Sequence, residues 1–393
     1  MIPYGKQTIC PADINAVIEA LSSNLITQGP KVDAFERAVA NKVGAKFGVA
    51  TNSATSSLHL ACLSLGLSVG KRLWTSSNTF VASANCGLYC DANVDFVDID
   101  PATYNLCPQK LKKKLIVAEK ADQLPDILVA VHMCGQSCNM EAINTLAKCY
   151  GFAVIEDASH AIGAKYQNQY VGNCRYSDIT VFSFHPVKII TTAEGGMAIT
   201  NNIELAKAMK NLRSHGITND PAELKDTNQG AWYYEQTALG FNYRMTDLQA
   251  ALGISQLTRL DEFVERRNQL AVRYNEKLDS LPLTTTTLLI DCKSAWHLYV
   301  IQLENPSYRR HVFDVMREQG IGVHVHYIPV HTQPHYQKLG FNWRQFPTTE
   351  EYYHAALSLP LFFNMTEDEQ DQVVATLSNA ISSALNARIK SKR

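Results

Sequence analysis

The most informative stretch of this chain is Ser183-Phe184-His185-Pro186-Val187-Lys188-Ile189-Ile190-Thr191-Thr192-Ala193-Glu194, which runs into Gly195-Gly196. It places Lys188 just after an apolar strand, between a proline turn and a glycine pair. A lysine held in this way has a fixed, partly desolvated amine, whose lowered pKa suits it to attack an aldehyde. Taken alone, the pattern also fits a solvated loop lysine, so a second signal has to decide.

The second signal is a pair of acidic residues at the end of an upstream strand. Gly151-Phe152-Ala153-Val154-Ile155 predicts a short buried strand, and Glu156-Asp157 stand at its carboxyl edge, where open α/β sheets bind their ligands. Asp157 could simply cap the helix expected after it, or it could pair with a pyridinium nitrogen and keep that ring protonated. Because the next strand, over 178–183, delivers Lys188 to the same edge, the acid and the amine together predict a pyridoxal phosphate site.

A third segment is typical of a phosphate-binding helix start. The strand over 47–50 is followed by Asn52-Ser53-Ala54-Thr55-Ser56-Ser57 and then by an apolar helical run. Small hydroxyl residues at a helix start leave backbone N–H groups and the positive end of the helix dipole free for an anion. The same residues are also the commonest helix caps, so this segment gains weight only beside the other two.

Together these motifs resemble the DegT-type sugar-nucleotide aminotransferases, which are fold-type-I pyridoxal phosphate enzymes. Segments 25–30, 240–246 and 325–329 are also similar to family motifs, and all occur in family order from residue 2 to about residue 363. The resemblance implies an α/β fold with a mostly parallel seven-stranded sheet between helices. It further implies a large cofactor-binding domain over 1–250 and a smaller α+β C-terminal domain over 251–393.

The resemblance also implies residue roles. Lys188 would carry the cofactor, Asp157 would pair with the pyridine nitrogen and His160 would lie near the ring hydroxyl, and these three are the expected catalytic residues. Expected cofactor-binding residues are Ala54, Thr55, Ser56, Phe80 (stacked on the ring), Asp157, His160, Ser183, Lys188 and Asn242, the last reaching the partner subunit's cofactor. Expected substrate-binding residues are Tyr4, Thr27, Arg244, His326 and Tyr327.

Two alanines narrow the resemblance. Ala54 and Ala193 stand where most of the family has glycine, and they look like those of transaminases that make UDP-4-amino-4,6-dideoxy-N-acetyl-β-L-altrosamine, a pseudaminic acid precursor. The implied reaction moves an amino group from L-glutamate to C4 of a UDP-linked 4-keto-6-deoxy-N-acetylhexosamine, in a homodimer with shared active sites. The alternatives are the same chemistry on a different nucleotide-linked keto sugar, or a cofactor-binding regulator that does not catalyse.

Composition limits the other possibilities. The 393 residues are 46% hydrophobic and 19% charged, as in ordinary globular proteins, and the length predicts about two domains. A net charge of −1 gives no electrostatic reason to expect nucleic acid or an anionic membrane as partner. The first sixteen residues do not resemble a signal peptide, so we expect a cytoplasmic protein with reduced thiols. The ten cysteines show no zinc spacing, and no metal is expected.

Strand and helix patterns alternate through the first half, which predicts a mostly parallel sheet covered on both faces. Helices are predicted over 11–22, 31–43, 55–65, 79–90, 108–121 and 140–150, and strands over 47–51, 72–75, 94–97, 127–132, 152–155 and 195–200. Beyond these we predict one long helix over 246–278, strands over 298–302 and 322–327, helices over 309–319 and 367–387, and a frayed tail over 388–393.

Two segments leave alternatives open. The polar stretch over 217–240 fits a packed loop or a flap at a dimer interface or substrate site, and the packed loop is favoured. His324, His326, His331 and His335 could contact substrate, bind a metal or pack in the interior. Because no carboxylate or cysteine accompanies them, we favour contact with substrate over a metal site.

Overall fold

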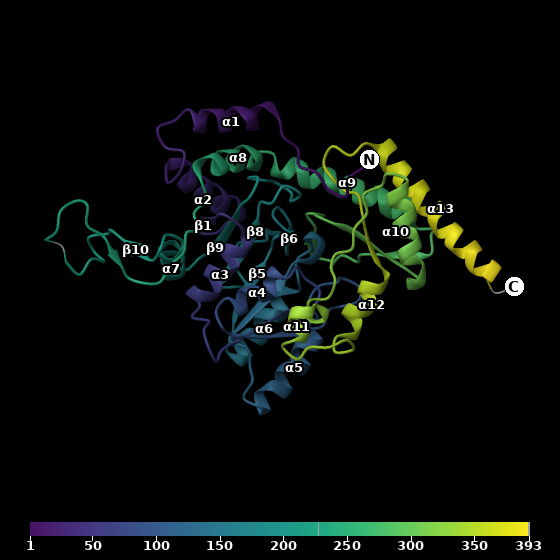
Figure 1. Cartoon of the computed structure of the whole chain (residues 1–393), viewed down its shortest axis with the longest axis horizontal. Helices are drawn as coiled ribbons and strands as arrows, with labels where there is room; N and C mark the ends of the chain where they lie inside the picture. The colour runs from purple at the N-terminus through teal and green to yellow at the C-terminus, as the bar shows by residue number, and fades with distance from the viewer. Residues whose placement is uncertain (227, 392–393) are drawn as a thin grey trace.

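The computed structural model describes residues 1–226 and 228–391, and a seven-stranded sheet forms the centre of its larger part (Figure 1). In spatial order the strands are β1 (Phe47–Thr51), β9 (Gly196–Thr200), β8 (Ile179–Ser183), β5 (Ala153–Asp157), β4 (Ile127–Val131), β2 (Arg72–Ser76) and β3 (Asn93–Val97). Within this sheet β9 runs antiparallel to both of its neighbours, and the pairs from β8 to β3 are parallel. The predicted mostly parallel seven-stranded sheet is confirmed.

Helices cover both faces of this sheet, which explains why its strands are apolar on both sides. Alternate strand residues pack against α3 (Ala54–Ser64), α4 (Ala82–Leu88) and α7 (Ile203–Arg213) on one face. The other face packs against α2 (Pro30–Val43), α5 (Pro108–Lys120), α6 (Met140–Tyr150) and α8 (Asp247–Leu257), and α1 (Pro11–Leu21) lies on α8. Strands β5 and β8, being parallel, both end at the edge where β1 leads into α3.

A second, smaller core is built by the C-terminal part of the chain. Strands β12 (Leu283–Thr285), β14 (Tyr299–Leu303) and β15 (Ala356–Leu359) form an antiparallel sheet. It packs with α9 (Leu260–Leu278), α10 (Arg309–Glu318) and α13 (Glu367–Ser391), and α12 (Pro347–Ala355) contacts β14. The short helix α11 (Pro334–Gln337) instead packs through Tyr336 against Phe96 of the large sheet. The predicted domain division at 250/251 falls inside α8, and it stays a prediction.

The N-terminal segment joins this second core. Ile2 pairs with Ile321, and its carbonyl accepts a hydrogen bond from the Gly322 N–H (2.6 Å). A Cβ on Gly322 would lie 2.9 Å from the Tyr4 nitrogen, so only glycine permits this close approach. The contact carries Tyr4 from the start of the chain to the junction of the two cores.

Two of the predicted elements are wrong. The single helix over 246–278 is interrupted between α8 and α9, where the Thr258 hydroxyl donates to the Ser255 carbonyl and Arg259 turns to pair with Asp13 (2.6 Å). The strand over 322–327 is replaced by isolated bridges, because this segment leaves the small sheet and crosses to the large one.

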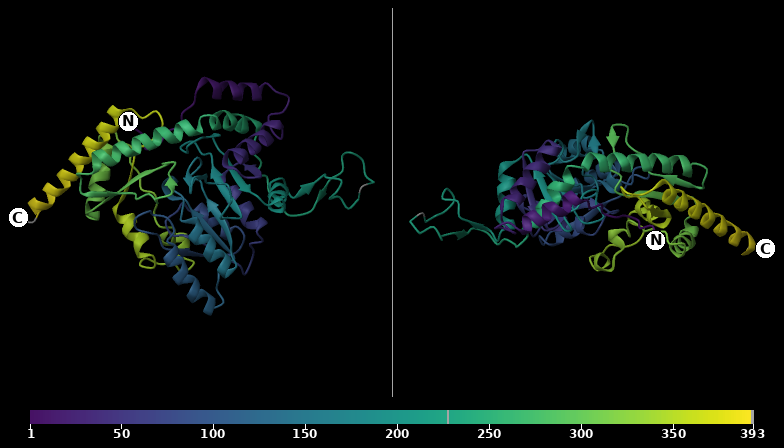
Figure 2. Two further views of the ribbon diagram at one scale, coloured as in Figure 1. Left: turned by 180° about the vertical axis from the view of Figure 1, so that it is seen from behind. Right: turned by 90° about the horizontal axis from the view of Figure 1, so that it is seen from above.

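Within the stretch over 217–240, the described residues (all but 227) are not packed on the body of the chain. They extend away from the sheet as an arm with a short ladder between β10 (Ile217–Thr218) and β11 (Glu235–Gln236) (Figures 1 and 2). Trp232 and Leu239 on this arm are 80% and 83% exposed. The favoured packed-loop interpretation is therefore wrong for the described part of the segment, and the flap interpretation stays a prediction.

Three short strands complete the fold: β6 (Lys165–Tyr166), β7 (Gln169–Tyr170) and β13 (Cys292–Lys293) form a small sheet of their own. The tail predicted over 388–393 instead continues α13 to residue 391, and residues 392–393 lie outside the described part. Across the part that is described, none of the helices combines the length and apolarity needed to cross a membrane.

Candidate functional site

A cavity of about 440 Å³ lies at the carboxyl edge of the large sheet, where the C-terminal part of the chain meets it. Parallel strands end together at this edge, so side chains that are distant in the sequence converge there. Most of the predicted site residues line the cavity: Tyr4, Ala54, Thr55, Phe80, Asp157, His160, Ser183, Lys188, His326 and Tyr327.

Lys188 is held by the loop between β8 and β9. The Phe184 N–H donates to the Gly195 carbonyl (2.9 Å) and closes the base of the loop, and the Lys188 N–H donates to the His185 carbonyl (2.9 Å). Burial of the amine lowers the pKa of Lys188 to about 8, although the charge of Asp157 acts in the opposite direction. An amine with this pKa is largely protonated at neutral pH but has an accessible free-base fraction.

Asp157 is the last residue of β5, and both of its carboxylate oxygens are held. One accepts a hydrogen bond from the Ser83 hydroxyl on α4 (2.6 Å), and the other accepts one from the Ser159 N–H (3.1 Å). Neither partner is a cation, so the negative charge of Asp157 remains available to a cationic group in the cavity.

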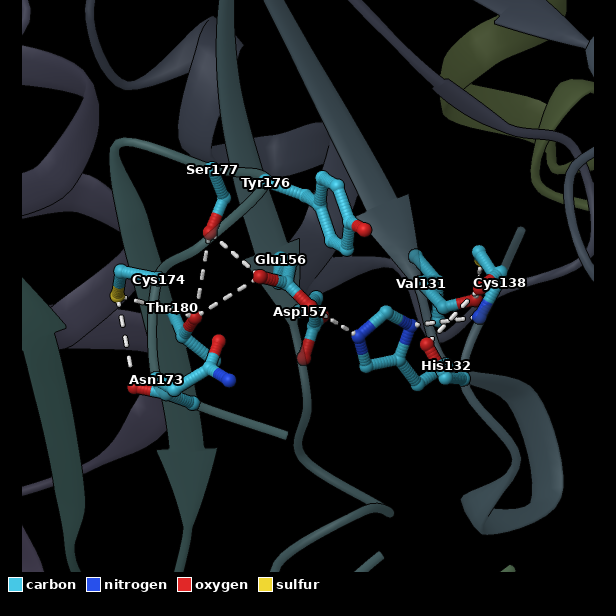
Figure 3. A network of polar contacts seen from close by, with 12 residues as sticks. Val131, His132, Cys138, Glu156, Asp157, Asn173, Cys174, Tyr176, Ser177 and Thr180 are labelled. Carbon is cyan, nitrogen blue, oxygen red and sulfur yellow. Dashed lines mark hydrogen bonds and ion pairs between the residues drawn. The ribbon is translucent and has the colours of Figure 1, made fainter. Parts of the chain in front are cut away.

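A buried histidine–carboxylate hydrogen bond lies beside Asp157 (Figure 3). The His132 Nε2 atom lies 2.7 Å from a Glu156 carboxylate oxygen, and the Cys138 N–H donates to His132 Nδ1 (3.1 Å). Because Nδ1 accepts this hydrogen bond it carries no proton, so the His132 ring is neutral and its Nε2–H donates to Glu156. Because the His132 N–H also donates to the Asp157 carbonyl (3.0 Å), this network anchors the end of β5.

The start of α3 opens toward the cavity. Ser53 is the N-cap residue, and its hydroxyl accepts a hydrogen bond from the Ser56 N–H (3.2 Å). At a helix start, the N–H groups of Ala54 and Thr55 have no intrahelical partner. The Ser183 side chain at the end of β8 lines the same cavity, so donors from two elements converge there.

Of the two alanines that distinguish this chain, Ala54 lines the cavity, whereas Ala193 lies on the loop that carries Lys188 and is exposed. Ala54 is the first residue of α3, and a Cβ on the facing Gly196 would lie 2.5 Å from its nitrogen, so position 196 requires glycine. Ala193 has a φ of 66°, in the left-handed region, which costs a residue with a Cβ roughly 1 kcal/mol or more. A hydrogen bond from the Ala193 N–H to the Thr191 hydroxyl (3.0 Å) stabilises this turn.

Aromatic and imidazole side chains form the opposite wall. The Tyr327 hydroxyl lies 3.2 Å from His160 Nε2, and His326 Nδ1 lies 2.8 Å from the Ser358 hydroxyl. The His324 and His326 rings stack at 4.6 Å, and Tyr4 contacts both of them. Burial lowers the pKa of His326 to about 3, so this ring is neutral and can act as donor or acceptor toward a ligand.

The four histidines of the C-terminal segment do not form one cluster. His324 and His326 line the cavity, whereas His331 is buried against Glu350 (3.0 Å) and His335 lies in a separate groove beside α4. Over the described ranges, no three His, Cys, Asp or Glu side chains come together in a way that could hold a metal ion.

Four predicted site residues lie outside the cavity of their own chain. The Ser56 hydroxyl is directed to Asn52 (2.6 Å) beneath the helix start. Thr27 pairs with Thr246 near the start of α8. Asn242 is exposed, and it and Arg244 belong to the segment that leads from the arm to α8.

One cavity residue was missed by the sequence analysis. His297 lies two residues before β14, with its Nε2 atom 3.4 Å from the Lys188 amine and its ring 4.4 Å from that of His160. The available signal was a histidine shortly before an apolar strand. Nothing in the local sequence pattern connected this histidine with Lys188. His185 and Glu194 also line the cavity without having been assigned a role, and His324, a predicted candidate for substrate contact, lies there as well.

Comparison with known proteins identifies the family. Residues 7–378 match the model of the DegT/DnrJ/EryC1/StrS aminotransferase family. The chain belongs to this family. It is therefore an aminotransferase, and the family's enzymes depend on pyridoxal phosphate.

Individual relatives span nearly the whole chain. The spore coat polysaccharide biosynthesis protein SpsC of Bacillus subtilis is 38% identical and covers 98% of both chains. The UDP-4-amino-4,6-dideoxy-N-acetyl-beta-L-altrosamine transaminase of Campylobacter jejuni is 38% identical and covers 96% of both. The solved structure of Helicobacter pylori PseC, an aminotransferase involved in pseudaminic acid biosynthesis, has a TM-score of 0.89 at 30% identity and covers 97% of this chain and 99% of its own.

The geometry of the cavity fits the family's cofactor. It offers free backbone donors at a helix start, a carboxylate whose two hydrogen-bond donors are uncharged, and the buried amine of Lys188. His160 Nδ1 is buried without a hydrogen-bond partner among the described residues, so the cavity also contains a polar atom that a bound group could satisfy.

Proposed function

We propose that this protein is a pyridoxal-phosphate-dependent aminotransferase that moves an amino group from L-glutamate to C4 of a UDP-linked 4-keto-6-deoxy-N-acetylhexosamine. The observation that carries the proposal is the convergence of Lys188, Asp157 and the start of α3 on one cavity. The sugar assignment rests on the resemblance of Ala54 and Ala193 to the altrosamine transaminases and on the relatives from Campylobacter and Helicobacter.

Each residue has a stated task in this proposal. The start of α3, through Ala54 and Thr55, and the Ser183 hydroxyl would bind the cofactor phosphate. Asp157 would accept a hydrogen bond from the protonated pyridine nitrogen, and Phe80 would cover the ring. When bound, pyridoxal phosphate supplies the aldehyde that accepts an amino group and the ring that takes up an electron pair.

Lys188 would move the protons. Its free amine would remove the proton from the α-carbon of glutamate, and the resulting ammonium would return a proton to the carbon that carried the aldehyde. The same amine would serve in reverse order at C4 of the keto sugar. A pKa of about 8 suits a group that must both accept and donate a proton near neutral pH.

The substrate assignment is tested with the protein loaded with pyridoxamine phosphate and mixed with two UDP-linked 4-keto sugars. We expect the aldehyde absorbance to return with the L-arabino sugar and not with the D-xylo sugar. If the absorbance returns with the D-xylo sugar alone, the protein is an aminotransferase as proposed but acts on the D-xylo sugar. If neither sugar reacts while glutamate still converts the aldehyde form, the acceptor is a different keto sugar. If glutamate also fails, the protein binds the cofactor without catalysis.

We also propose a homodimer with shared active sites. Among the described residues that line the cavity, Lys188 is the single lysine or arginine, although a cofactor phosphate and a diphosphate sugar carry several negative charges. The resemblance assigns Asn242 and Arg244 to this task from the partner subunit. Exposed apolar side chains on α1 and the segment after it support an interface: Ile14, Ile18, Leu21, Leu25 and Ile26 are 46–60% exposed.

Shared sites make a quantitative prediction. Lys188→Ala and Arg244→Ala chains should each be inactive alone, but a mixed dimer contains one site with both native residues. After subunit exchange in an equal mixture, we expect about a quarter of the wild-type activity, because about half of the dimers are mixed and each has one intact site. The measurement is turnover after dissociation and reassociation of the two variants.

The matched control replaces the Arg244→Ala chain with a double variant that carries Lys188→Ala as well. This mixture forms the same dimers but contains no lysine at position 188, so it should stay inactive. Absence of recovery in the first mixture, or full activity of dilute monomers, would contradict the shared site.

A further inference from the structure

His297 is a buried imidazole that the proposed chemistry does not use. It precedes β14 in the C-terminal part of the chain, yet its Nε2 atom lies 3.4 Å from the Lys188 amine on the large sheet. At this distance a direct, long hydrogen bond joins the two parts of the molecule at the reacting amine. The side chain is 5% exposed, so bulk water does not compete for this contact.

The backbone of His297 is fixed from two directions. Behind it, the guanidinium of Arg267 on α9 is 2% exposed and donates to the carbonyls of Trp296 (3.0 Å), His297 (3.5 Å) and Leu361 (2.9 Å). None of these acceptors is a carboxylate, so the charge of Arg267 is not neutralised by a contacting anion.

From the other side, the loop after β4 lies in close contact with the same backbone. Gly135 has a φ of 102°, and a Cβ at this position would lie 2.8 Å from the Trp296 nitrogen, 2.9 Å from the His160 carbonyl and 3.0 Å from the His297 nitrogen. The Ala295 N–H donates to the Gly135 carbonyl (3.0 Å). A glycine at this point therefore sets the distance between His297 and the wall that carries His160.

We propose that His297 is a positioning residue that holds the free amine of Lys188 by accepting its hydrogen bond. The inference rests on the proposed role of Lys188 and adds a residue from the C-terminal part of the chain to it. A neutral acceptor can orient the amine without adding the negative charge of a carboxylate, which would stabilise the ammonium more strongly.

The surroundings keep His297 uncharged. Burial and the nearby cations lower the pKa of His297 well below its usual range, so its Nε2 lone pair is available to accept. The titratable and charged groups that face this pair are Asp157, His160 and His326 around the cavity, His185 and Glu194 on the lysine loop, Tyr4 and Tyr327 on the opposite wall, and Arg267 behind His297. Of these, Asp157 raises the pKa of Lys188, whereas burial lowers it.

The test measures the protonation of Lys188 without requiring turnover. Full-length protein is first freed of pyridoxal phosphate, so that the Lys188 amine is not occupied by the cofactor aldehyde. It is then treated with trace acetic anhydride at a series of pH values, and acetylation at Lys188 is quantified by mass spectrometry. Because only the free amine reacts, the midpoint of the curve reports its pKa. We expect a midpoint of about 8 in the wild type.

Three substitutions at position 297 separate positioning from simple packing. His297→Phe removes the acceptor that favours the ammonium form, so the midpoint should fall by about one unit. His297→Gln keeps a neutral oxygen acceptor and should restore the wild-type midpoint. His297→Glu adds a charge and should raise the midpoint by about one to three units.

His335→Phe, in the separate groove beside α4, is the matched control and should leave the midpoint unchanged. Equal midpoints in the wild type and His297→Phe, or the same fall in His297→Gln as in His297→Phe, would overturn the proposal. If His297→Phe does not fold, the comparison of Gln and Glu at this position still decides, because a positioning contact requires a higher midpoint for Glu. If the wild-type protein does not turn over glutamate, the proposed function is refuted. The acetylation midpoints would still report whether His297 holds the Lys188 amine.

Discussion

Replacement of Lys188 by alanine is expected to abolish both half-reactions. The side chain lines the cavity with an amine whose pKa is lowered to about 8, and no other lysine or arginine of the described chain lines that cavity. Without it, no group of comparable basicity remains within reach of the reacting carbon, so we expect a loss of about 10⁴-fold or more. The measurement is single-turnover conversion with glutamate and, separately, with the keto sugar.

Lys293→Ala is the matched control for this loss. Lys293 is an exposed lysine that pairs with Glu265 (2.8 Å) outside the cavity, and its replacement should leave both half-reactions unchanged. Turnover by the Lys188→Ala protein at the wild-type rate would refute the role given to Lys188. Retention of one half-reaction alone would mean that another residue moves the proton in that step.

Replacement of Asp157 by asparagine should separate cofactor retention from catalysis. The carboxylate is held by Ser83 (2.6 Å) and by the Ser159 N–H (3.1 Å), so an amide of the same shape can occupy its place. The amide has no charge to keep the pyridine nitrogen protonated, and loss of a buried charge partner costs about 3 kcal/mol or more. We therefore expect Lys188 still to carry the cofactor while turnover falls at least about 100-fold.

Asp261→Asn makes the same change of charge at an exposed position that pairs with Lys42 and should have no effect on turnover. Cofactor content is measured by absorbance and turnover with glutamate in both variants. Full activity of Asp157→Asn would remove Asp157 from the role proposed here. Loss of the cofactor itself would mean that the carboxylate serves binding rather than the electronic state of the ring.

Much of the large sheet and of its carboxyl edge could be predicted from local patterns. Short apolar runs alternate with amphipathic helices, and each run can be buried on both faces only in a parallel sheet between helices. Asp157, Lys188 and the start of α3 each directly follow or end such a run. Because these strands are parallel, Asp157, Lys188 and the start of α3 lie at the same edge of the sheet.

The C-terminal part was harder to predict because its contacts are made with distant segments. The segment over 322–327 has the apolar alternation of a strand, but within it only His324 forms a bridge, to Ser358, as the segment crosses toward the large sheet. The arm over 217–240 carries aromatic residues that suit a packed loop, yet Trp232 is 80% exposed on this chain. The local spacing of apolar residues predicts neither the loss of the strand over 322–327 nor the exposure of the arm.

His297 marks the boundary between the two kinds of information. The motifs around Lys188, Asp157 and Ser53 are local, since each residue is placed by the strand or helix next to it, and the chain order alone determined that they meet. The contact between His297 and Lys188 joins residues 109 positions apart. It depends on Arg267 and Gly135, which hold the backbone of His297 through atoms that no sequence pattern brings together. Tertiary packing decided this contact. The distance between His297 and Lys188 depends on the size and charge of the side chains that pack between the two parts of the chain, and these come from distant segments.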